Sequence, residues 1–189
     1  MKKLLITAAL YTAVTTVLLG LVYPLVMTGI AQVLFHDKAN GQIVYQGGKA
    51  AGSRLIGQPF TGDAYFHSRP SAAGEGYDAA NSGASNLAPT SGKLVTIVEE
   101  RTEAEKVGKQ PVPIELVTAS ASGLDPHISP AAALYQVPRV ARARGITETE
   151  LRPFIDRFTE GRQLGLFGEP RVNVLALNLE LDRVHPKTR

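Results

Sequence analysis

The first 35 residues carry a continuous apolar run. From Leu4 to Phe35 the sequence contains no Asp, Glu, Lys, Arg or His. About 20 apolar residues span the hydrocarbon core of a bilayer, so this run predicts a membrane-spanning helix. Cleaved signal peptides have shorter apolar regions, and buried core helices are seldom apolar on all sides over such a length. We therefore expect a transmembrane anchor over residues 1–35.

Two lysines precede the apolar run, and no other charge flanks its N-terminal side. Positively charged flanks stay on the cytoplasmic side of a membrane. The pattern therefore predicts a single-pass protein with a cytoplasmic N-terminus. Residues 36–189 then form an extracytoplasmic domain, which is periplasmic if the membrane is a bacterial inner membrane.

Within the apolar run, small side chains recur every four residues, at Ala8, Thr12, Thr16 and Gly20. A ridge of small residues lets another helix approach closely, so these four are candidates for contact with a partner helix. The alternative is chance, because such residues are common in membrane spans. Pro24 lacks an amide donor and is predicted to bend the helix or end its regular part.

Beyond the anchor, the pattern changes to short strands, turns and helices. β-branched, aromatic or alternating residues predict strands at residues 42–45, 53–58, 64–67 and 171–181. Helical spacing predicts helices over residues 90–108, 111–120, 129–145 and 147–159. Ser129 before Pro130 is typical of an N-cap, and Thr147 with Glu150 of a capping box. The fold class is thus α+β, with a single N-terminal transmembrane helix followed by one mixed α+β extracytoplasmic domain, its strands near both ends.

A polar segment, residues 68–92, separates the predicted strands from the first helix of the domain. So long a loop without regular structure is unusual in a compact domain and is often functional. Its polar side chains are candidates for binding a partner, although they could instead only close turns. These candidates are Tyr77, Asp78, Asn81, Ser82, Ser85 and Asn86.

Composition excludes several classes of function. The formal net charge is +3, and two of the lysines precede the membrane span, so the rest of the chain is nearly neutral and offers no field for nucleic acid. The sequence has no cysteine, which excludes disulfides, thiol catalysis and thiolate metal sites. His36, His67 and His185 are scattered without metal-ligand spacing, so no metal site is expected. Arg139, Arg142 and Arg144 form a basic cluster that is typical of a solvated helix face, and the alternatives are a contact with lipid headgroups or with an acidic partner.

Asp125, His127 and Ser129 place the residue types of a charge-relay hydrolase within five positions. A relay is defined by spatial geometry, which closeness in sequence does not supply, and no G-x-S-x-G turn is present. Asp125 before Pro126 favours a turn, and Ser129 is explained as a helix cap. The three residues are therefore retained as candidates for contact with a partner. A membrane-anchored hydrolase or binding module remains the alternative function, and no residue is predicted to be catalytic.

Long phrases of the sequence resemble one family. They are YFHSRPSAAG, YDAANSGASNLAPTS, VTASASGLDPHISPAAALYQVPRVARARG and GEPRVNVLALNLELD. Together they are similar to the C subunit of the bacterial Kdp potassium-transporting P-type ATPase. The resemblance implies a non-catalytic accessory subunit of an inner-membrane complex. It implies three partners: a channel-like A subunit, a P-type ATPase B subunit and a small F subunit.

The resemblance also implies a chaperone-like role that raises the affinity of the B subunit for ATP. The chain itself has neither a D-K-T-G phosphorylation site nor a T-V-G-Y-G filter, which agrees with an accessory role. No cofactor is expected to bind firmly, and ATP is expected only through a complex with the ATPase subunit. ATP is cytoplasmic, whereas Lys2 and Lys3 place the domain outside. We therefore expect any effect on ATP use to be indirect.

Overall fold

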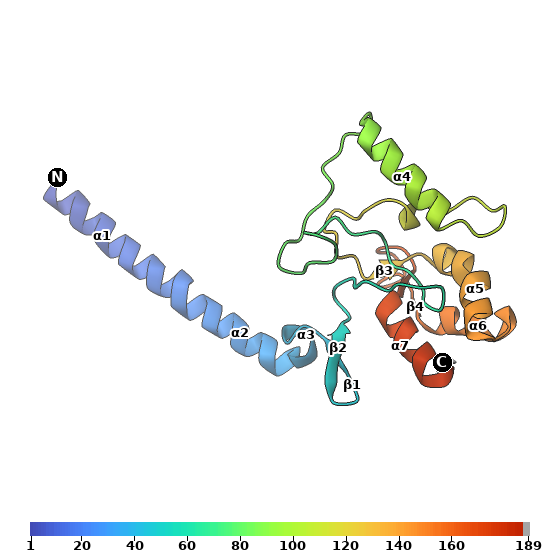
Figure 1. Ribbon diagram of the computed structural model, residues 1–189. Helices are drawn as coiled ribbons and strands as arrows, with labels where there is room; N and C mark the ends of the chain where they lie inside the picture. The colour runs from blue at the N-terminus through green and yellow to red at the C-terminus, as the bar shows by residue number, and fades with distance from the viewer. Residues whose placement is uncertain (187–189) are drawn as a thin grey trace. The chain divides into compact units, whose positions relative to one another are not determined.

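The structure is a computed structural model that describes residues 1–186, and the chain divides into two compact units between Ile43 and Val44 (Figure 1). The first unit is a long helix made of α1 (Lys2–Val17), a π-helical turn η1 (Leu18–Val22) and α2 (Tyr23–Leu34), followed by the short α3 (His36–Ala39). The most apolar 18-residue stretch within Lys2–Leu34 has a mean hydropathy of 2.1 and is not buried, so this helix is long and apolar enough to cross a membrane.

The π turn explains how the helix tolerates Pro24. Proline cannot donate the usual backbone hydrogen bond, and its ring crowds the carbonyl four residues earlier, which here belongs to Gly20. Gly20 lies within η1, whose wider turn commonly accommodates such a disturbance. The predicted irregularity is thus present, and α-helix resumes at Tyr23. A Cβ atom added at Gly20 would lie 3.9 Å from the Thr16 methyl group, so these two ridge residues share one face.

The second unit mixes short strands with helices, which confirms the α+β class. Its elements are β1 (Ile43–Gln46), β2 (Lys49–Ser53), α4 (Gly92–Ala104), the 3-10 turn η2 (Ile114–Leu116), β3 (His127–Ile128), α5 (Pro130–Arg144), α6 (Glu148–Arg157), β4 (Thr159–Glu160), β5 (Arg171–Asn173) and α7 (Val174–Val184). Strands β1 and β2 form a hairpin. The other three form an antiparallel sheet in the order β3-β5-β4, with Ile128 and Thr159 both opposite Val172.

The core lies between this small sheet and helices α5, α6 and α7, which Figure 1 shows gathered around it. Apolar side chains with no more than 1% exposure come from all four parts. They include Ile128, Val137, Val140, Leu151, Ile155, Val172, Val174, Leu177 and Leu181. Helix α4 contributes no buried residue. The predicted caps of α5 and α6 are confirmed, since Ser129 accepts a hydrogen bond from the Ala132 amide and Thr147 forms a capping box with Glu150.

The predicted strand over residues 171–181 is wrong beyond its first three positions. Asn173 ends β5 and caps α7 by accepting a hydrogen bond from the amide of Ala176. The alternating leucines suggested a period of two, but Val174, Leu177, Asn178 and Leu181 are all buried. Their spacing is that of one helix face. The prediction failed because it placed Asn178 on the solvent side, whereas this amide is completely buried.

Other helix and strand boundaries also differ from those predicted from the sequence. The strand expected at 53–58 lies earlier, at β2, and the expected helix over 111–120 is reduced to η2. Helix α5 continues through Pro138 to Gly145, whose left-handed conformation, φ 67°, ends it. Strands also occur in the middle of the domain, at β3 and β4, and not only near its ends. Residues 64–67 are not part of any sheet.

Candidate functional site

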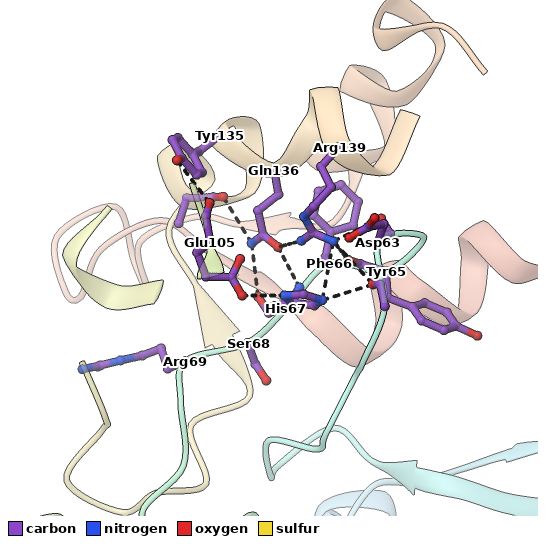
Figure 2. Close-up of polar contacts among 12 residues, drawn as sticks. Asp63, Tyr65, Phe66, His67, Ser68, Arg69, Glu105, Tyr135, Gln136 and Arg139 are labelled. Atoms are coloured by element: carbon purple, nitrogen blue, oxygen red, sulfur yellow. Dashed lines mark hydrogen bonds and ion pairs between the residues drawn. The ribbon is translucent and has the colours of Figure 1, made fainter. Parts of the chain in front are cut away.

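The segment Ala64–Ser68 crosses the domain without a neighbouring strand, and side-chain amides take the place of one. The Asn178 side chain accepts a hydrogen bond from the Phe66 amide and donates one to the Phe66 carbonyl, both at 2.9 Å. The Gln136 side chain does the same for His67, at 2.7 and 3.1 Å (Figure 2). Because Gln136 lies on α5 and Asn178 on α7, the segment ties these two helices together.

Two arginines of α5 complete this attachment. The guanidinium of Arg139 donates to the carbonyls of Asp63 and Tyr65 at 3.1 and 3.0 Å, and burial lowers its pKa. Arg144 donates to the Ala64 carbonyl at 2.6 Å. The expectation of a solvated basic face is therefore wrong for both of these residues. Of the three arginines, Arg142 alone is exposed.

The fully buried side chain of Arg144 also forms an ion pair with a residue of α7. It donates to the Asp182 carboxylate at 2.9 Å and lies over the Tyr65 ring, 5.2 Å from its centroid. The Tyr65 hydroxyl in turn donates to the same carboxylate at 2.9 Å. A charge removed from water needs such partners, and here each partner belongs to the segment or to α7.

A cleft of about 330 Å³ opens beside His67. The Nδ1 atom of His67 lies 2.7 Å from the carboxylate of Glu105, just beyond the end of α4, and Figure 2 shows this pair next to Gln136 and Arg139. Tyr77 and Arg101 line the same cleft. Burial raises the pKa of the Tyr77 hydroxyl, which donates to the Arg69 carbonyl at 2.9 Å. The tyrosine therefore stays protonated and acts as a donor near neutral pH.

The polar loop that carries most candidate residues is folded by its own side chains. Asp78 accepts hydrogen bonds from the Asn81 side chain at 2.5 Å and the Ala80 amide at 2.9 Å, and these bonds lower the pKa of its carboxyl. Ser82 donates to the Ser122 carbonyl at 2.9 Å. Asn86 has a positive φ of 52°. These contacts show how the loop closes, and its role in binding stays a prediction, as does that of Ser85.

Gly123 lets this loop approach the segment before β3. Its φ is +67°, and a Cβ atom there would lie 2.7 Å from both the Ala73 amide nitrogen and the Gly83 carbonyl oxygen. Any other residue would push the two chain segments apart. The loop is therefore packed closely against the Ser120–Leu124 segment and forms part of the folded domain.

The structure does not assemble a charge relay from Asp125, His127 and Ser129. Asp125 accepts a hydrogen bond from the His127 amide at 3.0 Å and lies 3.4 Å from the guanidinium of Arg69. The Ser129 hydroxyl bonds to the carboxylate of Glu115 and caps α5. The Ser129 hydroxyl is bound to a carboxylate and not to the His127 imidazole, so the serine–histidine contact of a charge relay is absent.

The resemblance implies an interaction with ATP through the complex. The lining of the cleft beside His67 does not suit ATP. A triphosphate requires several cations or free amide donors. The Arg101 guanidinium of the cleft donates to the Val117 carbonyl at 3.2 Å, and Glu105 adds a negative charge next to it. Within residues 1–186 no group of three or more His, Cys, Asp or Glu side chains is placed to hold a metal ion.

The residues that organise this region were missed in the sequence. His67, Glu105, Gln136 and Asn178 were not among the candidates, and Arg139 was considered only as part of a surface cluster, although YFHS and its neighbours contributed to the resemblance. A usable signal was Gln136, a polar residue on the apolar face of a predicted helix and one turn before Arg139. The ridge in the first unit, Ala8 to Gly20, is exposed, and its role in helix contact stays a prediction.

Comparison with known proteins gives a consistent result over nearly the whole chain. The family described as "KdpC: K+-transporting ATPase, c chain" matches residues 5–183. A potassium-transporting ATPase KdpC subunit from Koribacter versatilis is 65% identical, covering 98% of this chain and 97% of the relative. Those from Acidobacterium capsulatum and Rhodospirillum rubrum are 59% and 54% identical, covering 95% and 98% of this chain and 97% and 98% of their own. The chain belongs to the KdpC family, the c chains of K+-transporting ATPases.

Proposed function

We propose that the chain is a non-catalytic accessory subunit of a high-affinity, ATP-driven potassium uptake complex in the bacterial inner membrane. The observation that carries this proposal is the family match over residues 5–183, together with relatives named as subunits of a potassium-transporting ATPase. The unassembled relay at Asp125, His127 and Ser129 weakens the alternative of an anchored hydrolase.

The anchor Lys2–Leu34 crosses the bilayer once, and the domain lies on the periplasmic side. Support comes from the span itself and from Lys2 and Lys3 at its N-terminal end. A C-terminal fusion to a reporter that is active only in the cytoplasm tests this topology. Strong reporter activity would contradict the proposed orientation.

The partners are the channel-like A subunit, the ATPase B subunit and the small F subunit, with the surrounding lipid and without nucleic acid. The domain sits over the external mouth of the A subunit, where it stabilises the complex or shapes ion entry. The ridge of small residues on the anchor, Ala8 to Gly20, packs against a partner helix. The polar loop and the Asp125–Ser129 segment contact a partner outside the membrane. Loops held on a rigid scaffold are the usual place for such contacts.

The chaperone-like effect on ATP binding is then an indirect coupling through the complex. Two binding events that influence each other do so reciprocally and by the same factor. If this subunit raises the affinity of the B subunit for ATP, ATP must tighten retention of this subunit to the same extent. Titration of ATP into complexes with and without the subunit, and of the subunit with and without ATP, measures both factors. Unequal factors would exclude a simple equilibrium coupling.

Mild detergent purification of the tagged chain from potassium-limited cells tests the function as a whole. The A, B and F subunits should be recovered with it, and deletion of the chain should abolish growth at limiting potassium. A chain that is recovered alone would favour an anchored binding module. An Asn81→Ala, Asn86→Ala double variant tests the polar loop, because unchanged recovery and growth would remove these residues from the interface.

A further inference from the structure

The connection between β4 and β5 exposes three large apolar side chains at one point. Leu164, Leu166 and Phe167 are 89%, 76% and 63% exposed. Single apolar side chains on a surface are ordinary, but three within four residues form a patch of the kind that marks interaction sites. We call residues 162–169 the apolar tip.

The apolar tip has a defined conformation. The backbones of Gln163 and Phe167 bond to each other in both directions, at 2.8 and 2.9 Å. The Arg162 guanidinium contacts both carboxylate oxygens of Glu169 at 2.8 Å and closes the base of the tip. Leu164 has a positive φ of 54°, which a bulky residue adopts only when its surroundings hold it there. A preformed loop loses little conformational entropy when it docks.

The charges around the tip favour a protein over a lipid as its partner. Loops and helices that enter a lipid surface gain from unpaired Lys and Arg and from Trp or Tyr at the headgroup level. Here Arg162 is paired with Glu169, and Arg171 lies 2.9 Å from Glu160 at the foot of the loop. The tip is therefore apolar and electrically neutral, with Phe as its one aromatic residue. A fixed shape of this kind suits an apolar pocket that is equally fixed.

We propose that the apolar tip anchors this domain by inserting Leu164, Leu166 and Phe167 into an apolar pocket on the extracytoplasmic face of another subunit of the potassium-transporting complex. This inference rests on the proposed function, which supplies the partner. It assigns the binding energy of this interface to the apolar tip, which contains none of the polar candidate residues described above. A few buried anchors of this type carry most of the affinity of a protein interface.

Co-purification of the full chain with the membrane subunits in mild detergent tests the tip. A Leu166→Ser, Phe167→Ser double variant should reduce recovery of the complex at least tenfold. The matched control is Leu55→Ser, Ile114→Ser, which removes two apolar side chains that are 50% and 75% exposed elsewhere and should leave recovery unchanged. Phe167→Leu, which keeps the patch apolar, should also retain the complex. Equal recovery of the tip variant and the control would overturn the inference alone. An unsubstituted chain that is recovered without the other subunits would overturn the proposed function as well.

Crosslinking identifies what the tip touches. The sequence contains no cysteine, so Leu164→Cys creates one reactive site for a maleimide that carries a photoactivated benzophenone. The labelled full chain, assembled with the other subunits in membranes, should form an adduct with one of them on illumination. Adducts only with lipid, or only with a second copy of this chain, would overturn the inference.

Discussion

Two irregular segments of the domain place their apolar side chains in opposite environments. In the segment Ala64–Ser68, Phe66 is completely buried, and the side chains of Asn178 on α7 and Gln136 on α5 bond the backbone of Phe66 and His67. In the apolar tip, Leu164 is 89% exposed, and the backbone is held by bonds within the tip itself. The first segment is therefore part of what keeps the domain folded. We expect that the second can be changed without loss of the fold, which would leave it free to bind a partner.

The largest loss of stability should follow from removing the Asn178 amide, which bonds Phe66 of the first segment. Asn178→Leu leaves the amide and carbonyl of Phe66 buried without partners, and each such group costs about 1–3 kcal/mol. We expect a loss of about 3 kcal/mol in the free energy of unfolding. Chemical unfolding of the detergent-solubilised full chain, followed by circular dichroism, measures it. The control is Asn81→Ala, which removes an exposed amide bonded to Asp78 within the polar loop and should cost less than about 1 kcal/mol. A loss below about 1 kcal/mol at Asn178 would contradict the assignment.

Arg144→Met tests the arginine attachment, with a control on the same helix. The substitution leaves the half-buried Asp182 without its guanidinium and frees the carbonyl of Ala64. We expect a loss of about 2 kcal/mol, less than for a fully buried pair because the Asp182 side chain is 26% exposed. Arg142→Met, at an exposed neighbouring position, should change stability by less than about 0.5 kcal/mol. Equal effects at both positions would mean that the Arg144 contacts contribute nothing specific.

The pH dependence of stability reports on His127, which lies in β3 beside the foot of the tip. Burial lowers its pKa below the ordinary 6.5, Arg171 lowers it further, and Glu160 and Asp125 oppose this. The unfolded chain therefore binds the proton first, so stability falls as the pH drops below 6.5 toward the folded pKa. The slope from one group is at most about 1.4 kcal/mol per pH unit. His127→Gln should flatten the unfolding profile in this range, and an unchanged slope would exclude His127 as its source.

The smallest effect on stability should come from the tip. The Leu166→Ser, Phe167→Ser variant removes side chains that are mostly in water already, so its free energy of unfolding should change by less than about 0.5 kcal/mol. The same unfolding assay measures it beside the Asn178→Leu variant. A loss above about 1 kcal/mol would show that the tip supports the fold, and the contrast between the two segments would disappear.

Local signals in the sequence were sufficient where the chain makes its own contacts. Ser129 and Thr147 were found as caps because capping joins residues three positions apart, and Pro24 was found because its effect is confined to one turn. The site was harder, because its residues meet across 69 and 112 positions, as Gln136 and Asn178 do with the segment at 66–67. Alternation of leucines concealed α7 because the buried polar Asn178 belongs to its core face.

The sequence by itself determined the apolar span, the caps, the mixed α+β class and the family, since each follows from composition, spacing or long matching phrases. The tertiary structure decided which polar residues are internal, that Ala64–Ser68 bonds to helix side chains and not to a strand, and that Leu164, Leu166 and Phe167 remain in water. The physical reason is that burial is a property of the folded chain. An amide or a leucine has the same identity in the core as on the surface, and only packing between distant segments determines which of the two it occupies.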